Sequence, residues 1–192
     1  MKKTLQRGKC SKERIIILQL KKLKCIVEGE PFNRTVKPGK YPVLLNIIRF
    51  ENEDERIAYA IIKLSRKSSV KWELALSNGQ IESDLQGEQF SGYGVDTGNG
   101  CFIDDHVLKF ILSEQSQKGE DDIYDELEEA LEKSYEDTRS WLVTHFQEKV
   151  DLAIFSTGFG DGVYLSFWGT DENGDEVCLV TDFLLMDEMG EI

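Results

Sequence analysis

The chain has few of the residues that usually carry metal or redox chemistry. It contains only two histidines and four cysteines, and Cys10, Cys25, Cys101 and Cys178 lie far apart without a CxxC spacing. Zinc knuckles and redox motifs require closely spaced sulfur atoms, so the sequence disfavours both. We therefore interpret the cysteines as reduced thiols, with Cys25 and Cys178 buried in strands.

Long apolar runs are also lacking. No uncharged stretch approaches the roughly 20 residues of a membrane-spanning helix. The basic first segment leads into only six uncharged residues, Ile15 to Leu20, before Lys21. The apolar region of a secretion signal needs about 7–15 residues and a following cleavage site. We therefore expect a cytoplasmic protein that has no contact with a membrane.

Charge is divided unevenly along the chain. Residues 1–50 carry thirteen Lys or Arg and three Glu, whereas the rest carries ten basic and thirty-three acidic residues, so the net charge of −13 is the sum of +10 and −23. Either each end has a partner of opposite charge, or the two ends face each other in the fold. The basic residues are scattered through strand-like sequence, which favours the second explanation. Nucleic acid is disfavoured, because the domain as a whole repels phosphate.

The order of hydrophobic patterns predicts an α+β fold. Residues 13–192 suit a single domain, preceded by a flexible N-terminus at residues 1–12. Strand-like runs come first, two helical patterns follow and further strands close the chain, which favours a mainly antiparallel sheet or sandwich with two inserted helices. We expect a meander over residues 41–85 that turns at Asn78-Gly79. The predicted strands span residues 14–27, 41–50, 56–65, 70–76, 151–156, 163–169 and 176–185.

The second helical pattern has a strongly acidic face. Apolar residues recur at roughly helical spacing, so we predict a helix from Asp121 or Asp122 to about Gln147. Five pairs of acids stand at i,i+4 on its exposed face, and at roughly 0.2–0.5 kcal/mol each they cost about 1–2.5 kcal/mol in an isolated helix. Packing or a nearby cationic surface must offset this repulsion. The acids that we consider candidates for binding a partner are Asp125, Glu128, Glu129, Glu132 and Glu136.

Two stretches, Gly92 to Asp105 and Phe155 to Gly169, combine many glycines with aspartates. Glycine at this density lets the backbone turn through positive φ and approach another group closely. We predict that the two stretches meet at one end of a β framework. Aspartates brought together there would hold a divalent cation or raise one another's pKa, although no motif supports a metal. The candidate ligands are Asp96, Asp104, Asp161 and Asp182.

The acidic candidates also have structural interpretations. Asp161, between Gly160 and Gly162, is the kind of loop aspartate that accepts hydrogen bonds from its own backbone in an Asx-turn. Residues 171–175 place acids as a calcium loop does, but the glycine stands at the wrong position. A hairpin loop explains that segment better.

Two further pairs of residues have alternative interpretations. Cys101 and His106 could form a nucleophile and its base, but no third residue that would orient them is evident. Trp168 and Tyr164 would share one strand face, either as core residues or as a pair that stacks a ligand. One sequence leaves both alternatives open.

Six blocks of sequence are distinctive: YPVLLNI, DERIAYAIIKLS, VKWELAL, GYGVDTGNGCFID, IFSTGFGDGVYLSFWG and LVTDF. In this order, over about Val36 to Phe183, they resemble a bacterial family of unknown function, the one numbered 4241. The family usually has Ser where Thr157 stands and Trp where Phe159 stands, and both departures are mild. The resemblance implies a bacterial, cytosolic domain and carries over no activity, cofactor or catalytic residue. Proteins of this kind sometimes accompany toxin–immunity systems.

No complete catalytic constellation can be assembled from these residues. We therefore expect a non-enzymatic binding or interaction module, of the immunity type or another, that meets a cationic protein through its acidic helix. The alternative is a metal-assisted hydrolase or a small-ligand-binding enzyme built on the four aspartates.

Overall fold

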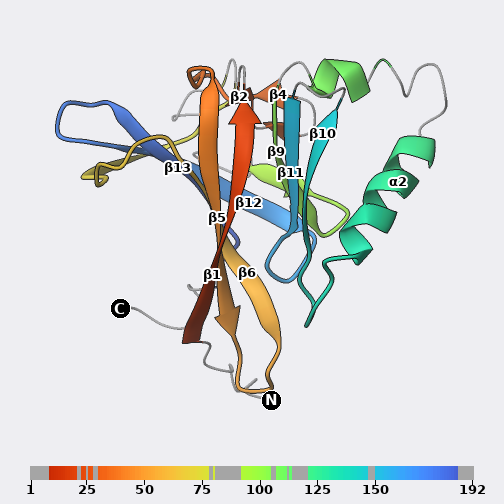
Figure 1. Cartoon of the computed structure of the whole chain (residues 1–192). Helices are drawn as coiled ribbons and strands as arrows, with labels where there is room; N and C mark the ends of the chain where they lie inside the picture. The colour runs from red at the N-terminus through yellow and green to blue at the C-terminus, as the bar shows by residue number, and fades with distance from the viewer. Residues whose placement is uncertain are drawn as a thin grey trace.

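Strands dominate the computed structural model of the chain (Figure 1). The structure describes residues 9–20, 23–24, 26–27, 30–77, 80, 92–104, 107–111, 113, 121–146 and 150–185. The strands are β1 (Lys9–Leu20), β2 (Leu23–Lys24), β3 (Ile26–Val27), β4 (Glu30–Pro31), β5 (Gly39–Arg49), β6 (Glu55–Lys63), β7 (Lys71–Leu74), β8 (Tyr93–Val95), β9 (Asn99–Asp104), β10 (Trp141–Phe146), β11 (Val150–Ser156), β12 (Gly162–Thr170) and β13 (Glu176–Asp182). Helical structure comprises α2 (Asp121–Glu132) and a shorter stretch at residues 107–111. Neither helix in these ranges combines the length and the apolar character that crossing a bilayer requires.

The first sheet is antiparallel and has the strand order β1-β5-β6-β13-β12-β7, with β8 paired to the start of β12. Two of its strand pairs are hairpins that local sequence predicts. A polar turn joins β5 to β6, and the loop containing Asn173-Gly174 joins β12 to β13. Among the other neighbours, β6 with β13, β12 with β7 and β12 with β8 come from distant parts of the chain.

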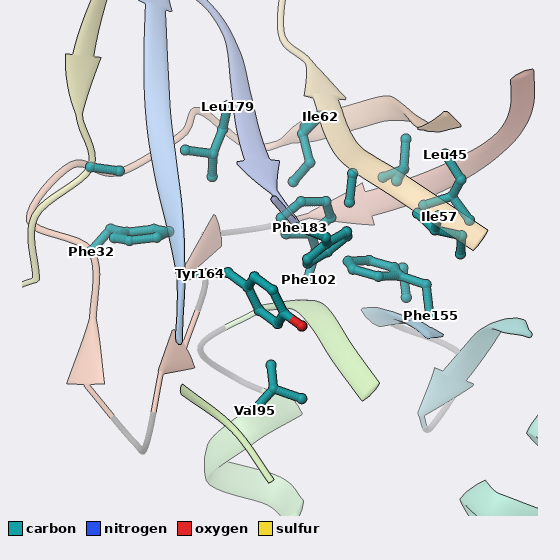
Figure 2. Close-up of a cluster of buried hydrophobic side chains, with 14 of the residues drawn as sticks. Phe32, Leu45, Ile57, Ile62, Val95, Phe102, Phe155, Tyr164, Leu179 and Phe183 are labelled. Carbon is teal, nitrogen blue, oxygen red and sulfur yellow. The ribbon is translucent and has the colours of Figure 1, made fainter. Parts of the chain in front are cut away.

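A second sheet, β10-β11-β9-β2, packs against the first. Successive side chains of a strand point to opposite faces, so Phe102, Ala153 and Phe155 join residues of the first sheet in the main core. The rings of Phe155 and Phe183 lie 6.1 Å apart at the centre of this cluster (Figure 2). The first sheet contributes Val43, Leu45, Ile47, Ile57, Ala60, Ile62, Trp168 and Leu179.

Helices cover the other face of the second sheet. Figure 1 shows α2 beside β10 and β11. Residues of β9 and β11 that face away from the main core form a second core with the helices, namely Ile103, Leu152 and Ile154 with Val107, Ile111, Leu127 and Leu131. The molecule is thus a two-sheet sandwich with a helical layer on one side, which confirms the predicted α+β fold with a mainly antiparallel sheet.

The predicted long helix is wrong beyond Glu132. Residues 141–146 form β10 instead, because Trp141 and Val143 pack on the main core while Leu142 packs on the second core. A strand that is covered on both faces has a continuous apolar run, and such a run is compatible with a helical pattern.

The chain reverses between α2 and β10 in a tight turn. Glu136 and Arg139 exchange backbone hydrogen bonds of 2.9 and 3.0 Å. The two residues between them, Asp137 and Thr138, have φ values of 49° and 70°. Positive φ at both central positions is the geometry of a two-residue hairpin turn. Glu136, expected on the acidic helix, therefore belongs to this turn.

The predicted meander over residues 41–85 is wrong at its third strand. β7 pairs with β12 rather than with β6, because β13 and β12 lie between them. Val70 and Trp72, within the predicted strand at residues 70–76, are 59% and 52% exposed. The predicted turn at Asn78-Gly79 lies outside the described residues.

Three further details of β1, β5 and β6 come from the structure. β1 begins at Lys9, within the segment expected to be loosely attached. Along β5, buried residues alternate with half-buried ones from Val43 to Ile47. In β6 a bulge leaves Ala58 without a partner residue on β5, because Asn46 lies opposite Tyr59 and Ile47 opposite Ile57. The bulge puts Ile57, rather than Ala58, on the face of the main core.

Candidate functional site

The two glycine-rich stretches meet, as predicted. β8 pairs with β12, where Val95 lies opposite Gly162, and β9 pairs with β11. Between these pairs, Thr157 N donates to Gly98 O at 3.0 Å. The stretches thus form one loop cluster that connects the two sheets, built from residues 96–98 and 157–161.

Asp161 connects the two halves of this loop cluster. Its Oδ1 atom accepts a hydrogen bond from Gly98 N at 2.8 Å, across 63 residues of sequence. Gly98 has a φ of 66°, a conformation that glycine adopts without steric cost. The Asp161 carboxylate therefore holds the neighbouring loop in place instead of forming the expected Asx-turn.

The four candidate aspartates do not converge. Asp96 and Asp161 are exposed neighbours in the loop cluster, but Asp104 is buried at the far end of β9, five residues from Asn99 and so roughly 17 Å away. Asp182 ends β13, where its Oδ1 atom accepts from Leu184 N at 2.8 Å. Within the described ranges no three His, Cys, Asp or Glu side chains are placed to hold a metal ion together.

An exposed aromatic residue in the loop cluster escaped the sequence analysis. Phe159 is 55% exposed, and its ring lies 5.7 Å from that of Phe50 and 5.0 Å from the guanidinium of Arg56. Arg56 also donates to Gly158 O at 3.2 Å. These contacts hold an aromatic ring at the surface. Strand alternation could not reveal it, because Phe159 lies in a loop between two glycines.

The acids of α2 whose side chains the structure describes are exposed to solvent. Leu127 and Leu131 attach the helix to the second core, and the acids at the other positions point outward. No ion pair joins these acids to a cation in the part of the chain that the structure describes, and the last helical turn contains no basic residue. The exposed acids are Asp125, Glu126, Glu128, Glu129 and Glu132.

The ion pairs that the structure describes lie elsewhere. Arg34 pairs with Glu73 and, at 3.6 Å, with Glu176, which agrees in part with the expectation that the basic end of the chain faces the acidic part. Lys67, which lies outside the basic end, pairs with Asp171. All these pairs lie on or beside the first sheet, so among the residues that the structure describes the expected complementation between the ends does not extend to α2.

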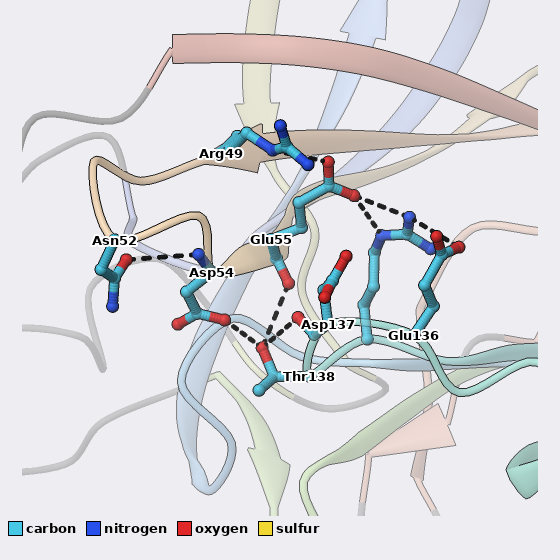
Figure 3. A network of polar contacts seen from close by, with 8 residues as sticks. Arg49, Asn52, Asp54, Glu55, Glu136, Asp137 and Thr138 are labelled. Atoms are coloured by element: carbon cyan, nitrogen blue, oxygen red, sulfur yellow. Dashed lines mark hydrogen bonds and ion pairs between the residues drawn. The ribbon is translucent and has the colours of Figure 1, made fainter.

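A buried ion-pair network ties the turn after α2 to the first sheet (Figure 3). The side chains of Arg139 and Glu55 are both 0% exposed, and Arg139 Nε and Nη2 donate to Glu55 Oε2 at 2.9 and 2.7 Å. Arg49 Nε donates to the other carboxylate oxygen at 3.1 Å. Glu136 accepts from Arg139 at 3.1 Å, and Thr138 donates to the Glu55 carbonyl at 3.2 Å. The network fixes the turn, and we assign it a structural role.

The acidic loop after β12 is a hairpin loop, as predicted. Asp171 Oδ1 accepts from Asn173 N at 2.9 Å and from Asp175 N at 3.0 Å, while its other oxygen binds Lys67. The hydrogen bond from Lys67 lowers the pKa of Asp171, and the same bond raises the pKa of Lys67. This carboxylate is fully used in shaping the loop.

A second carboxylate with a shifted pKa lies on β7. Hydrogen bonds from Lys71 and Arg34 lower the pKa of Glu73 to about 2, from an ordinary value of 4.5. The cause is the two cations beside it, because hydrogen bonds and positive charge both favour the ionised carboxylate. Glu73 therefore stays charged over the whole physiological range, as a surface ion-pair residue.

The remaining candidates belong to the interior or lie outside the described residues. Cys178 is a buried free thiol in β13, as predicted, and Cys101 is a half-buried free thiol in β9. Trp168 and Tyr164 are 1% and 5% exposed and belong to the main core. Cys25 and His106 lie outside the described residues, so the distance between Cys101 and its suggested base, His106, is not defined.

A family model described as "Protein of unknown function (DUF4241)" matches residues 23–181. The chain belongs to this family. The matched range runs from the start of β2 to the last residue but one of β13 and includes the loop cluster, α2 and the buried network. No curated protein and no solved structure matches the chain.

Proposed function

We propose that the protein is a non-enzymatic binding module that captures a cationic protein partner through the acidic face of α2. The observation that carries this proposal is a set of five exposed acids that form no ion pair with a cation of the described chain. Fast capture by charge would suit an immunity-type inhibitor, which must reach a toxin before the toxin acts.

The acidic face costs stability as it stands. Asp125 with Glu129, and Glu128 with Glu132, are acids at i,i+4 in α2, and each pair costs roughly 0.2–0.5 kcal/mol. The later acids also lie near the C-terminal end of the helix, where the helix dipole favours cations. A cationic partner would relieve both repulsions on binding.

The proposal is tested by reversing charge on the helix and, separately, elsewhere. Glu128, Glu129 and Glu132 are replaced by Lys in one variant, and the exposed loop residues Glu51, Glu53 and Glu172 in the control. Both variants carry the same net charge, −13 + 6 = −7. Partners are captured from cells of the native host, identified by mass spectrometry, and purified for association kinetics at several salt concentrations.

The α2 variant is expected to lose the partner that the wild type and the control retain. Its association rate at low salt should fall at least about tenfold, and its salt dependence should become weaker. Equal loss in both variants would mean that net charge alone attracts the partner. A partner that binds all three proteins equally, or is not basic, would refute a role for the acidic face.

A further inference from the structure

A cavity of about 300 Å³ opens beside the first sheet, away from both α2 and the loop cluster. It lies where the segment before β5 passes over β12 and the end of the β12–β13 loop. Trp168, almost fully buried, lies at its floor, while Lys37 and Asp175 are exposed at its mouth. Its lining residues are Arg34, Thr35, Val36, Lys37, Tyr41, Leu64, Trp168, Asp175 and Glu176.

A buried hydrogen-bond donor beneath the floor of the cavity is unused. Trp168 is 1% exposed, and its Nε1 atom has no hydrogen-bond partner. Leaving a buried donor unsatisfied costs about 1–3 kcal/mol, so such groups are rare. Phe32 packs edge-on against the same indole, with ring centroids 6.2 Å apart. An acceptor atom on a bound molecule would satisfy the indole N–H.

A lysine at the mouth of the cavity, unpaired among the described residues, favours an anion. Both lining acids already have cations: Glu176 pairs with Arg34 at 3.6 Å, and Asp175 with Lys67 at 3.5 Å. The ammonium group of Lys37 has no ion-pair partner among the described residues. Tyr41 Oη donates to the Lys37 carbonyl at 2.7 Å, which holds this segment against the start of β5. The unused groups are therefore a cation and an N–H donor.

We propose that this cavity binds a small organic anion with a flat apolar body. The acidic head group would meet Lys37 at the mouth, and the body would lie among Val36, Leu64 and Trp168, with an acceptor toward the indole N–H. A volume near 300 Å³ is at the small end of ligand sites, so the ligand is the size of a single substituted ring. This inference does not depend on the proposed role of α2.

Indole N–H resonances in two-dimensional NMR spectra provide the test. The chain has three tryptophans, and Trp72→Phe and Trp141→Phe assign the signal of Trp168 by elimination without altering the cavity. The probes are benzoate, phenyl phosphate, the neutral analogue benzamide and inorganic phosphate. Lys37→Ala removes the cation at the mouth, and Lys40→Ala removes an equally exposed lysine nearby that does not line the cavity.

The expected result is a saturable shift of the Trp168 signal with benzoate or phenyl phosphate at millimolar concentration, and a weaker response to benzamide and inorganic phosphate. The stronger of the two anions identifies the head group as carboxylate or phosphate. Lys37→Ala should weaken binding about 2- to 5-fold, as expected for an exposed ion pair, and Lys40→Ala should not. An unmoved Trp168 signal, equal binding of benzamide, or equal effects of the two lysine variants would overturn the proposal.

Discussion

The buried pair of Glu55 and Arg139 provides the sharpest test of how this fold is stabilised. Neither side chain is exposed to solvent, and two hydrogen bonds of 2.9 and 2.7 Å join them. Removing one member of such a pair leaves the other as a buried charge, which typically costs about 3–5 kcal/mol. Replacing both members by apolar residues of similar size removes both charges, and is often neutral or stabilising.

The contacts that remain in each variant determine how much unfolding free energy we expect it to lose. In Arg139→Met, Glu55 keeps its bond of 3.1 Å to Arg49, so we expect a loss near the lower limit, about 3 kcal/mol. In Glu55→Leu, Arg139 keeps only Glu136, whose side chain is 58% exposed, so the loss should be at least as large. The double variant should recover most of either loss, because no charge is then left buried.

Urea unfolding measures these differences as changes in the free energy of unfolding at constant m-value. Lys71→Met is the control: it breaks the ion pair with Glu73, in which Lys71 is 68% exposed, and should cost under about 1 kcal/mol. If each single variant lost no more than this control, or if the double variant lost the sum of the single losses, the pair would not be a coupled buried unit.

Two further predictions concern a glycine and a carboxylate. Gly158 has a φ of 40°, and a Cβ atom there would lie 2.9 Å from the Phe183 carbonyl oxygen, so Gly158→Ala should lower the free energy of unfolding in urea by about 2–5 kcal/mol through strain and overpacking together. Gly174 has a φ of 83° and open space around it, so Gly174→Ala should lower this free energy by the strain alone, about 1–2 kcal/mol. Equal losses in the two variants would exclude a contribution from the contact with Phe183. The pKa of Glu73 is lower in the folded protein than in the unfolded chain, so the unfolded state binds more protons, and the stability contributed by Glu73 is complete above about pH 4.5 and lost as the pH falls toward about 2. The stability of Glu73→Gln should therefore fall less over this interval than that of the wild type or of Glu172→Gln, and parallel pH profiles would contradict the assignment.

Local sequence was sufficient to predict the features that depend on residues close together in the chain. The β12–β13 hairpin follows from an Asn-Gly turn between two strand-like runs, and the β5–β6 hairpin from a polar turn of the same kind. The meeting of the two glycine-rich stretches could be predicted because their composition suits close backbone approach, and Gly98 is where that approach occurs. The exposed acids of α2 likewise follow from periodicity, since Leu127 and Leu131 define the buried side.

Other features depend on contacts with distant segments of the chain, which no local sequence pattern identifies. Trp141 to Phe146 resembles the end of a helix, and becomes a strand because the main core covers one face and the second core the other. The bulge at Ala58 changes which side chains of β6 face the core, and a one-residue shift of this kind has no clear signature in an apolar run. Convergence of the four aspartates was predicted from strand ends, but Asp104 lies buried at the end of β9 that is opposite to the loop cluster.

The sequence by itself determined the α+β class, the two hairpins, the glycine-rich loop cluster and the acidic face of α2, because backbone preferences, turn chemistry and hydrophobic periodicity act over a few residues. Only the tertiary structure decided where α2 ends, which strand β7 joins, that Glu55 and Arg139 meet across 84 residues, and that Trp168 lies beneath a cavity with an unused N–H. These features depend on the packing of two sheets against each other, and burial of that kind is a property of the whole chain.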